Sequence, residues 1–542
     1  MFVLTGGNWT DGYLDEHRDP GTCRVQVSAW LRLRRIDDLY FVPGRDWKRV
    51  SNYVREIGTR QVWRKIRSRL AERGRNEKVL AVGAGRIVEP GAGQTLAAGT
   101  PVLFVAPCHP VAIERMVLPP GLVRAIQDDA WRRLVDAGGV LLHDDAPDLD
   151  AQIGPLALEG WHRLSGLPLD VGAAQAALAR LDGLGGTIAS RAWTRLALPS
   201  PSPVSERTPP IAAAGGAPLS AALFGLGHYA KTVVIPNLDP RLRLEAVHEI
   251  DPLQAGPHAG REFRLDTAPE PRPDERYDVY CITGYHHTHA PLAAHAIALG
   301  ASAIVEKPLV TTREQLDTLG AAVRQGPGRV YACFHKRYSH LTALAREDLA
   351  TAPGQPISYH CVVYEVPLPV HHWYRWPVSR TRLIANGCHW LDHFLFLNDF
   401  TPVRRADAWR AGNGDAICAV ELENGAVFSM ALTDHGSGRI GVRNHVELRA
   451  GRITVCITDD THYVAEDERA IRRRTRVNKM QAFARMYRQV SAAIVDGRPL
   501  DTAETVLVSA GLALDLDDAY VAQGGGMRAA DSTVPSRMPM LS

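Results

Sequence analysis

The stretch 221-AALFGLGHYAKTVV-234 decides the fold of the larger part of this chain. Its apolar start, Ala221–Phe224, predicts a strand, and the turn Gly225–Ala230 leads into a second apolar run that predicts a helix. In a G-x-G-x-x-A turn the first glycine allows the tight bend and the second lets backbone N–H groups approach a pyrophosphate, while the small last residue lets helix and strand pack closely. The pattern predicts the start of a dinucleotide-binding Rossmann unit. Its expected cofactor contacts are Gly225, Gly227, His228, Tyr229 and Ala230.

An acidic residue follows this turn at the distance that the motif requires. Leu242–Val247 predicts the second strand, and Glu249 stands just beyond its end. A carboxylate at this position accepts hydrogen bonds from the adenosine ribose hydroxyls and repels a 2′-phosphate. Glu249 therefore predicts NAD as the cofactor, with NADP less favoured.

Two further strand ends carry polar residues. Asp278–Thr283 predicts a strand that runs into the loop Gly284–His289, and Ala303–Val305 predicts another that ends in Glu306-Lys307-Pro308. Parallel α/β sheets bind ligands at the carboxyl ends of their strands, so both ends are expected at the cofactor. The residues expected there are Thr283, His286, His289, Glu306 and Lys307.

The composition excludes several classes of function. The 542 residues contain 62 Lys and Arg against 59 Asp and Glu, with 45% hydrophobic residues and a net charge of +3. This is typical of a soluble globular protein and gives no field that would attract nucleic acid or a membrane surface. No apolar run reaches about 18 residues and no signal peptide is indicated. The eight cysteines form no C-x-x-C pair, so we expect a cytoplasmic protein with reduced thiols and no metal.

A Pro- and Ser-rich stretch at 199–218 divides the chain and predicts a linker. Before it, strands are expected at Arg24–Leu33, Val79–Val88, Pro101–Ala106 and Glu114–Leu118, with a helical insertion at Trp47–Arg73. After it, strand and helix signals alternate and predict a parallel α/β domain, followed by an α+β domain rich in β-branched strands. The expected domains are 1–198, 219–345 and 346–522, with a flexible tail at 523–542.

Four motifs, in order, resemble the Gfo/Idh/MocA oxidoreductases. They are Gly225–Ala230, Thr288-His289-Ala290, Glu306-Lys307-Pro308 and Phe334–Tyr338. The resemblance covers roughly 220–514 and implies a Rossmann domain followed by an α+β domain with an open mixed sheet. It also implies a homo-oligomeric, NAD-dependent enzyme that acts on a sugar, sugar nucleotide, cyclitol or similar small polyhydroxylated substrate.

The resemblance also implies an active site. In this family the lysine of the E-K-P motif and a histidine on the helix entering the second domain face the nicotinamide, which points to Lys307 and His389 as catalytic residues. A near-neutral imidazole suits a base for the substrate hydroxyl, and an ammonium can orient the oxygen. The family often has an acid where this chain has Ala385, so the orientation of the base stays open. The expected substrate contacts are His335, Arg337, Trp373, Arg382, Asn386 and Asp392.

The N-terminal part is similar to the GroES-like barrel of medium-chain alcohol dehydrogenases, in Gly99–Val102 and Glu114–Pro119. Together with Cys388–Asp392, this resembles a bi-domain branch of the family fused behind a degenerate alcohol-dehydrogenase-like half. The cysteine, Gly-His-Glu and second glycine-rich motifs of an alcohol dehydrogenase are absent from this sequence. We therefore expect this half to serve as scaffold, substrate lid or oligomer surface.

Three functions stay open on the sequence. The first is net hydride transfer between NAD and a carbinol or carbonyl carbon of the substrate. The second is a redox-neutral reaction with tightly held NAD, such as epimerisation, dehydration or glycoside cleavage. The third is a non-catalytic nucleotide-binding scaffold, which Ala385 and the degenerate N-terminal half motivate.

Overall fold

A computed structural model describes most of the chain. The described residues are 2–5, 8–11, 23–35, 79–91, 95–109, 115–118, 120–143, 146–162, 171–196, 218–250, 263–366, 377–436, 441–500 and 502–525, with Tyr374 and single positions between 54 and 66. The expected linker up to residue 217, the expected substrate contact Trp373 and the end of the expected tail lie outside them.

Six parallel strands form the Rossmann sheet, in the order β12-β11-β10-β13-β14-β15. They are β10 (Leu219–Phe224), β11 (Leu242–His248), β12 (Arg264–Asp266), β13 (Val279–Ile282), β14 (Ser302–Val305) and β15 (Arg329–Ala332). The sequence order reverses between β10 and β13, and such a switch point is where open α/β sheets bind ligands. The sheet expected from the glycine turn is confirmed.

Helices cover both faces of this sheet because its strands are apolar on both sides. One core contains alternate strand residues and α8 (His289–Ala298), α9 (Arg313–Gln325) and α13 (Ala503–Tyr520). The other contains the remaining strand residues, the short π-helix η3 (Ala230–Val234) and α12 (Met480–Val495). The last two long helices of the chain thus return to the sheet that opens its C-terminal half.

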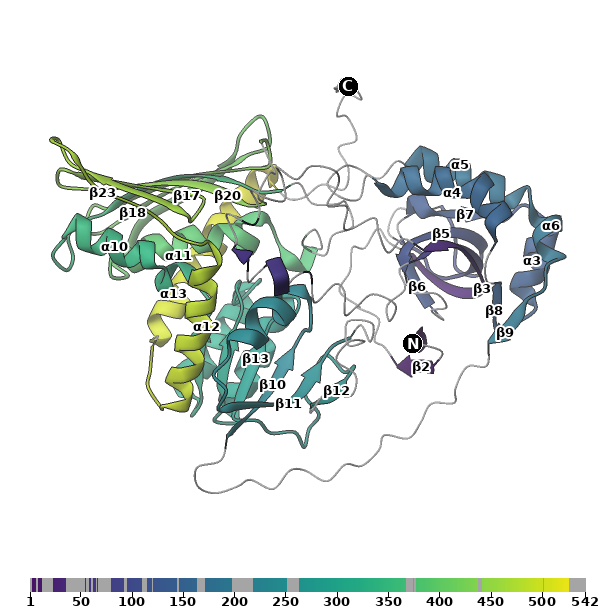
Figure 1. The fold of residues 1–542 in the computed structure, drawn as a ribbon, viewed down its shortest axis with the longest axis horizontal. Coiled ribbons are helices and arrows are strands. Elements are labelled where there is room, and N and C mark those ends of the chain that lie inside the picture. The colour runs from purple at the N-terminus through teal and green to yellow at the C-terminus, as the bar shows by residue number, and fades with distance from the viewer. Residues whose placement is uncertain are drawn as a thin grey trace.

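Eight strands form a second, mixed sheet, in the order β17-β18-β19-β16-β20-β21-β22-β23. They are β16 (Ser358–Tyr364), β17 (Val403–Arg410), β18 (Ala416–Leu422), β19 (Val427–Thr433), β20 (Arg443–Ala450), β21 (Ile453–Thr458), β22 (His462–Glu466) and β23 (Ile471–Arg476). Only β16 and β19 pair in parallel among them. The helices α10 (His340–Leu349) and α11 (Cys388–Leu397) lie on one side of this sheet (Figure 1). The expected open mixed sheet is confirmed.

The described N-terminal residues form a separate sheet, in the order β7-β5-β4-β3-β8-β9 with β6 beside β3. The strands are β3 (Cys23–Arg35), β4 (Val79–Glu89), β5 (Pro101–His109), β6 (Arg115–Leu118), β7 (Val123–Ala125), β8 (Val140–His143) and β9 (Thr194–Leu196), and a hairpin joins β1 (Phe2–Thr5) to β2 (Asn8–Asp11). The helices are α3 (Asp129–Asp136), α4 (Pro147–His162), α5 (Val171–Asp182) and α6 (Gly185–Ala189). Within the described ranges no strand pair joins β7 to β9, so a closed GroES-like barrel is not shown.

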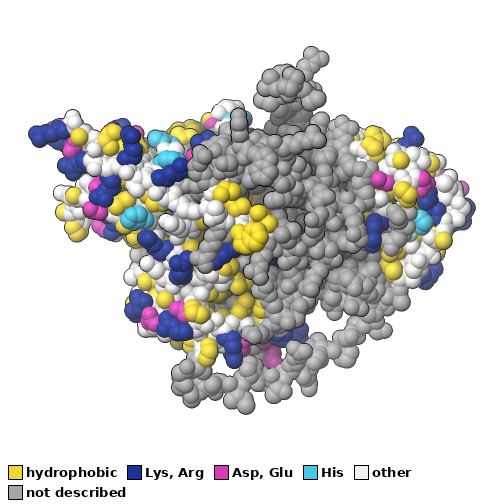
Figure 2. All heavy atoms as spheres, viewed as in Figure 1, with side chains coloured by type: hydrophobic (Ala, Val, Ile, Leu, Met, Phe, Trp, Pro, Cys, Tyr) yellow, Lys and Arg dark blue, Asp and Glu magenta, His cyan; other side chains and the backbone are white. Residues whose placement is uncertain are grey.

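The surface carries both signs of charge. Figure 2 shows Lys and Arg interspersed with Asp and Glu over the described part of one face, as the small net charge leads one to expect. Among the helices of the described ranges, none is long and apolar enough to cross a lipid bilayer.

Candidate functional site

The glycine turn after β10 has the backbone that its motif requires. Gly225 has a φ of +92°, and a Cβ atom there would lie 2.6 Å from the Cα of Gly284. Only glycine fits both the conformation and this close approach. Gly227 is exposed, and a Cβ at this position would meet nothing within 4 Å. The turn therefore leaves open space at the residue where backbone N–H groups would approach a pyrophosphate.

Glu249 closes the other side of this turn. Its carboxylate is buried and accepts a hydrogen bond from the Leu226 N–H, with 2.5 Å between Leu226 N and Glu249 Oε2. The acid predicted to recognise ribose is thus beside the turn predicted to hold the phosphates. Both groups fit an adenine dinucleotide in the orientation that the Rossmann motif imposes.

The loops after β13 and β14 are tied together by His289. Its Nδ1 lies 2.7 Å from the Pro308 carbonyl oxygen, and its Nε2 lies 3.2 Å from that of Gly284. Burial lowers the pKa of His289 to about 4, so the ring is neutral at neutral pH. These contacts hold the loops in place, while Thr283 Oγ1 donates to the Gly225 carbonyl at 2.7 Å. His286 is buried against Tyr374, with 4.7 Å between ring centroids.

Glu306 joins the glycine turn to α12. Its buried carboxylate accepts hydrogen bonds from the Tyr229 hydroxyl at 3.2 Å and from the Tyr487 hydroxyl. Burial raises the pKa of Glu306 above its usual range. Two of the expected cofactor residues, Tyr229 and Glu306, are therefore in contact. Tyr487 was not predicted, because nothing in the sequence indicates that α12 returns to this point.

Lys307 reaches from the end of β14 to the start of α11. Its ammonium donates to the Ala385 carbonyl at 2.8 Å and to Asn386 Oδ1 at 3.3 Å. Burial by itself lowers the pKa of Lys307, but Tyr374, Cys388 and the nearby carboxylates outweigh this and leave the pKa above its usual range. Lys307 is therefore a fixed positive charge, and two of its three N–H donors are used within the chain.

His389 lies within the electrostatic reach of Lys307. Burial, followed by the charges of His335 and Lys307, holds the pKa of His389 well below its usual range. Its ring centroid is 4.6 Å from that of His335, which in turn stacks on Phe483 at 3.8 Å. Among the described residues, His389 Nδ1 has no hydrogen-bond partner although it is buried. The structure thus brings together Lys307, His389 and His335 in one cluster.

Glu365, which no sequence motif indicates, is a second acidic residue near Lys307, in addition to Glu306. It stands just after β16, is 3% exposed, and lies 3.6 Å from Arg382 Nε through its Oε2. Burial raises its pKa, while Arg382, a hydrogen bond from Asn386 and the charge of Lys307 act in the opposite direction. Glu365 therefore places a buried carboxylate beside Asn386 and near Lys307. An acid at the end of an apolar strand is the signal that could have identified it.

Arg337 and Asp392, both expected as substrate contacts, form an ion pair with each other. Arg337 Nε donates to Asp392 Oδ2 at 2.9 Å, and the two side chains are 4% and 0% exposed. Ser509 Oγ donates to Asp392 Oδ1 at 2.7 Å. We assign this pair to the packing between η7 (His335–Tyr338), α11 and α13.

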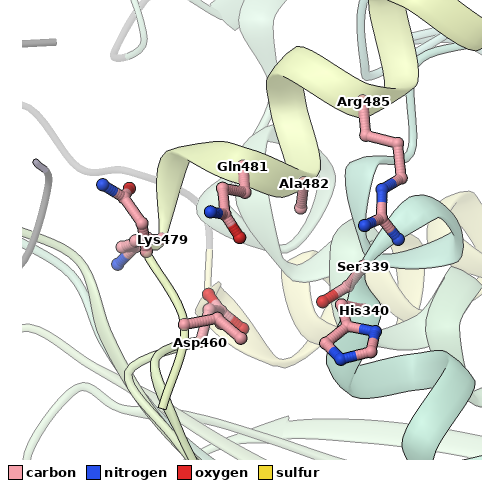
Figure 3. A pocket seen from close by; sticks show the side chains of 9 residues that line it. Ser339, His340, Asp460, Lys479, Gln481, Ala482 and Arg485 are labelled. Atoms are coloured by element: carbon pink, nitrogen blue, oxygen red, sulfur yellow. The ribbon is translucent and has the colours of Figure 1, made fainter. Parts of the chain in front are cut away.

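A small polar pocket lies beside this cluster, at the start of α12. Figure 3 shows its labelled side chains, which are Ser339, His340, Asp460, Lys479, Gln481, Ala482 and Arg485. Asp460 binds the ammonium of buried Lys336 at 2.5 Å, and these charges with Lys479 act on the neighbouring His335. The pocket is therefore electrostatically linked to the His335–His389 pair.

Comparison with known proteins agrees with the Rossmann fold of residues 219–334. Residues 219–334 match the family model described as "Oxidoreductase family, NAD-binding Rossmann fold", that of the Gfo/Idh/MocA proteins. This match indicates an oxidoreductase with an NAD-binding Rossmann domain, so NAD is the cofactor that the domain is built for. Residues 219–334 are similar to the corresponding domain of the Gfo/Idh/MocA oxidoreductases.

Three solved structures illustrate what the chain is similar to. GenD2 from gentamicin A biosynthesis, in complex with NAD, is 20% identical over 60% of this chain and 98% of its own, with a TM-score of 0.46. A dehydrogenase from Chromobacterium violaceum is 17% identical over 57% and 97%, with a TM-score of 0.49. An inositol dehydrogenase homologue from Azotobacter vinelandii, complexed with NADH and myo-inositol, is 16% identical over 56% and 96%, with a TM-score of 0.47.

Proposed function

We propose that the chain transfers a hydride between NAD and a carbinol or carbonyl carbon of a small polyhydroxylated substrate. The observation that carries this proposal is the cluster of Lys307, His389 and Glu365 beside the carboxyl ends of the Rossmann strands. Bound NAD supplies the hydride acceptor. A site rich in polar side chains suits a substrate with several hydroxyl groups, such as a sugar, sugar nucleotide or cyclitol.

His389 is the proposed base. Its lowered pKa keeps the imidazole neutral, and its Nδ1 is the buried nitrogen without a partner among the described residues. In this proposal the unprotonated nitrogen of the neutral His389 ring receives the substrate hydroxyl proton. His335 packs against the ring and fixes its plane.

Lys307 is the proposed electrostatic group. Its ammonium has a donor left after the contacts to Ala385 and Asn386, and this donor would bind the substrate oxygen. Glu365 acts through Asn386 and Lys307 and positions them. In this proposal Arg382, which forms an ion pair with Glu365, is a further residue that contacts the substrate.

The test is a spectrophotometric assay of NAD reduction with a panel of cyclitols, sugars and sugar nucleotides. We expect Lys307→Met and His389→Gln each to lower kcat by about 10²–10⁴-fold, with NADH binding retained. The matched control is His340→Ala, an exposed histidine outside the cluster. Wild-type protein inert with the whole panel, or full activity in either cluster variant, would contradict the proposal. Stoichiometric NAD copurifying with an inert protein would instead indicate redox-neutral chemistry.

We also propose that residues 1–198 are a degenerate alcohol-dehydrogenase-like half joined by the 199–218 linker to domains at 219–345 and 346–522. The antiparallel pairing of β3, β4 and β5 supports this relationship. In this proposal the N-terminal half holds no cofactor and acts as scaffold or lid. Zinc in stoichiometric amount, bound to the isolated segment 1–198, would contradict it.

A further inference from the structure

Three metal-binding side-chain types meet on the mixed sheet, away from the NAD site. His445 and Glu447 alternate along β20, and Cys456 stands directly opposite Glu447 on β21. Their ligand atoms, one from each residue, all lie within 4.8 Å of one another. Val446 and Leu448 between them belong to the core beneath α11, so the three side chains point to the opposite face.

We propose that His445, Glu447 and Cys456 form a binding site for a single Zn²⁺ ion. Imidazole nitrogen, carboxylate oxygen and thiolate sulfur are the donors that zinc takes in proteins, and three of them leave a fourth position for water. A calcium or magnesium ion would require oxygen donors throughout. The paired strands fix the three Cα positions, so only the side chains need to adjust.

The surroundings suit such an ion. The Thr458 hydroxyl and His445 Nδ1 are 3.1 Å apart, and this contact holds the imidazole ring in place. Metal-binding histidines are commonly oriented in this way through one ring nitrogen. Glu447 is bound by the guanidinium of Arg449, whose side chain is 62% exposed and can turn away into solvent. Arg449 is thus a competitor that neutralises the carboxylate until the ion binds.

The thiol must lose its proton when the ion binds. A cysteine thiol is largely protonated at neutral pH, and only the thiolate is a metal ligand. Binding breaks the S–H bond, forms the sulfur–zinc bond and releases the proton to solvent. The site lies on the face of the sheet opposite His389, so the ion would stabilise the sheet without touching the reacting atoms.

The experiment is isothermal titration of the chelator-treated full chain with Zn²⁺ and, in parallel, with Co²⁺. We expect one equivalent of Zn²⁺ with release of a proton, and a thiolate-to-cobalt charge-transfer band in the near ultraviolet. Cys456→Ser and His445→Ala each remove a ligand and should weaken binding by more than the about 10–100-fold that loss of an outer-shell partner costs. Arg449→Gln should strengthen it, because the competing guanidinium is gone.

The control variant is His435→Ala, an exposed histidine of the same domain outside the cluster, which should bind as the wild type does. Three results would overturn the proposal. They are no binding above that of buffer, binding that Cys456→Ser leaves unchanged, and a cobalt complex without a thiolate band. NAD reduction by the Cys456→Ser variant should equal that of the wild type, which separates this test from the test of the proposed function.

Discussion

Glu249 has two roles at the cofactor site, and one substitution separates them. Glu249→Gln keeps a side-chain oxygen for the Leu226 N–H but removes the charge that disfavours a 2′-phosphate. Hydrogen bonds to a charged group contribute about 1.5–3 kcal/mol, so we expect the preference for NADH over NADPH to fall roughly tenfold or more. Fluorescence titration with NADH and with NADPH measures this preference. Glu245→Gln, on the same strand but paired with Arg243, is the control. An unchanged preference would show that Glu249 serves the turn alone.

The buried His289 makes the fold sensitive to acid. Its pKa is about 4 in the folded chain against an ordinary 6.5, so the unfolded state binds the proton first as pH falls. The stability is complete above pH 6.5 and is lost as the pH falls toward 4. Between pH 7 and pH 5 this group costs about 2 kcal/mol of unfolding free energy. His289→Gln, which does not titrate, should make the pH dependence shallower by that amount in urea unfolding series. The exposed His340→Gln should leave it unchanged, and an equal slope in both variants would contradict the assignment.

At this scale the sequence could predict the residues whose roles are local. Gly225 and Gly227 follow from a contiguous motif, since the backbone of a tight turn depends on its own residues. Glu365 and the Arg337–Asp392 pair could not be predicted in this way. Their partners are distant in sequence, and a charged residue in an apolar stretch does not show whether it faces substrate or a buried counter-ion.

Among the elements, η7, α11 and α13 meet at one buried ion pair. Arg337→Met would leave the Asp392 carboxylate buried with only Ser509 as a partner. We expect a loss of about 3–5 kcal/mol of unfolding free energy, measured by urea unfolding. Adding Asp392→Leu should recover most of it, because an apolar pair of similar volume needs no counter-charge.

The matched control for this pair is Arg404→Met. Arg404 and Glu421 form an ion pair whose side chains are 67% and 41% exposed, and exposed pairs contribute about 0–1 kcal/mol. A large rise in KM with unchanged stability in Arg337→Met would instead restore the substrate role that the sequence suggested.

The long periodic elements were predictable, and the short ones were not. The strands β10, β11 and β13 lie within one or two residues of their expected positions, because their apolar pattern extends over several residues. β8 and β9 have four and three residues, too few for a period to show. The helix expected after the glycine turn is a π-helix, η3, in a run that contains the β-branched Thr232 and Val233.

For the whole molecule, the order of domains along the chain differs from their arrangement in space. Tyr487 and Met486 of α12 are in the same core as Leu223 of β10, about half of the chain away. α13 likewise packs against α9 of the Rossmann domain and against β17 of the mixed sheet. Two helices that follow the expected boundary near residue 345, α12 and α13, thus pack against the domain that precedes it. Sequence periodicity cannot reveal this packing. We infer that the two C-terminal domains fold as one cooperative unit.

The N-terminal half comes close to this unit at Gly58. A Cβ atom there would lie 2.1 Å from Asn478 Nδ2, whose residue lines the small pocket of Figure 3 and caps the Met480 N–H at 2.8 Å. Gly58→Ala should therefore displace the Asn478 side chain from its cap on the start of α12, at a cost of about 0.5–2 kcal/mol of local stability. Gly99→Ala is a close control, because Gly99 has the same φ of +84° but nothing within 4 Å of its Cβ position. Hydrogen exchange over residues 477–486 should accelerate in Gly58→Ala alone.

A second substitution distinguishes this contact from backbone strain. Asn478→Ser keeps a side-chain oxygen for the cap of α12 but shortens the group that a Cβ at position 58 would strike. In the Gly58→Ala and Asn478→Ser double variant, exchange over residues 477–486 should return to the rate of the Asn478→Ser single variant. Equal acceleration by Gly58→Ala and Gly99→Ala, or no rescue in the double variant, would mean that the helical insertion does not rest on α12 in solution. A return of the exchange rate in the double variant would place the N-terminal half near the His335–His389 pair. A substrate lid would have to occupy that position.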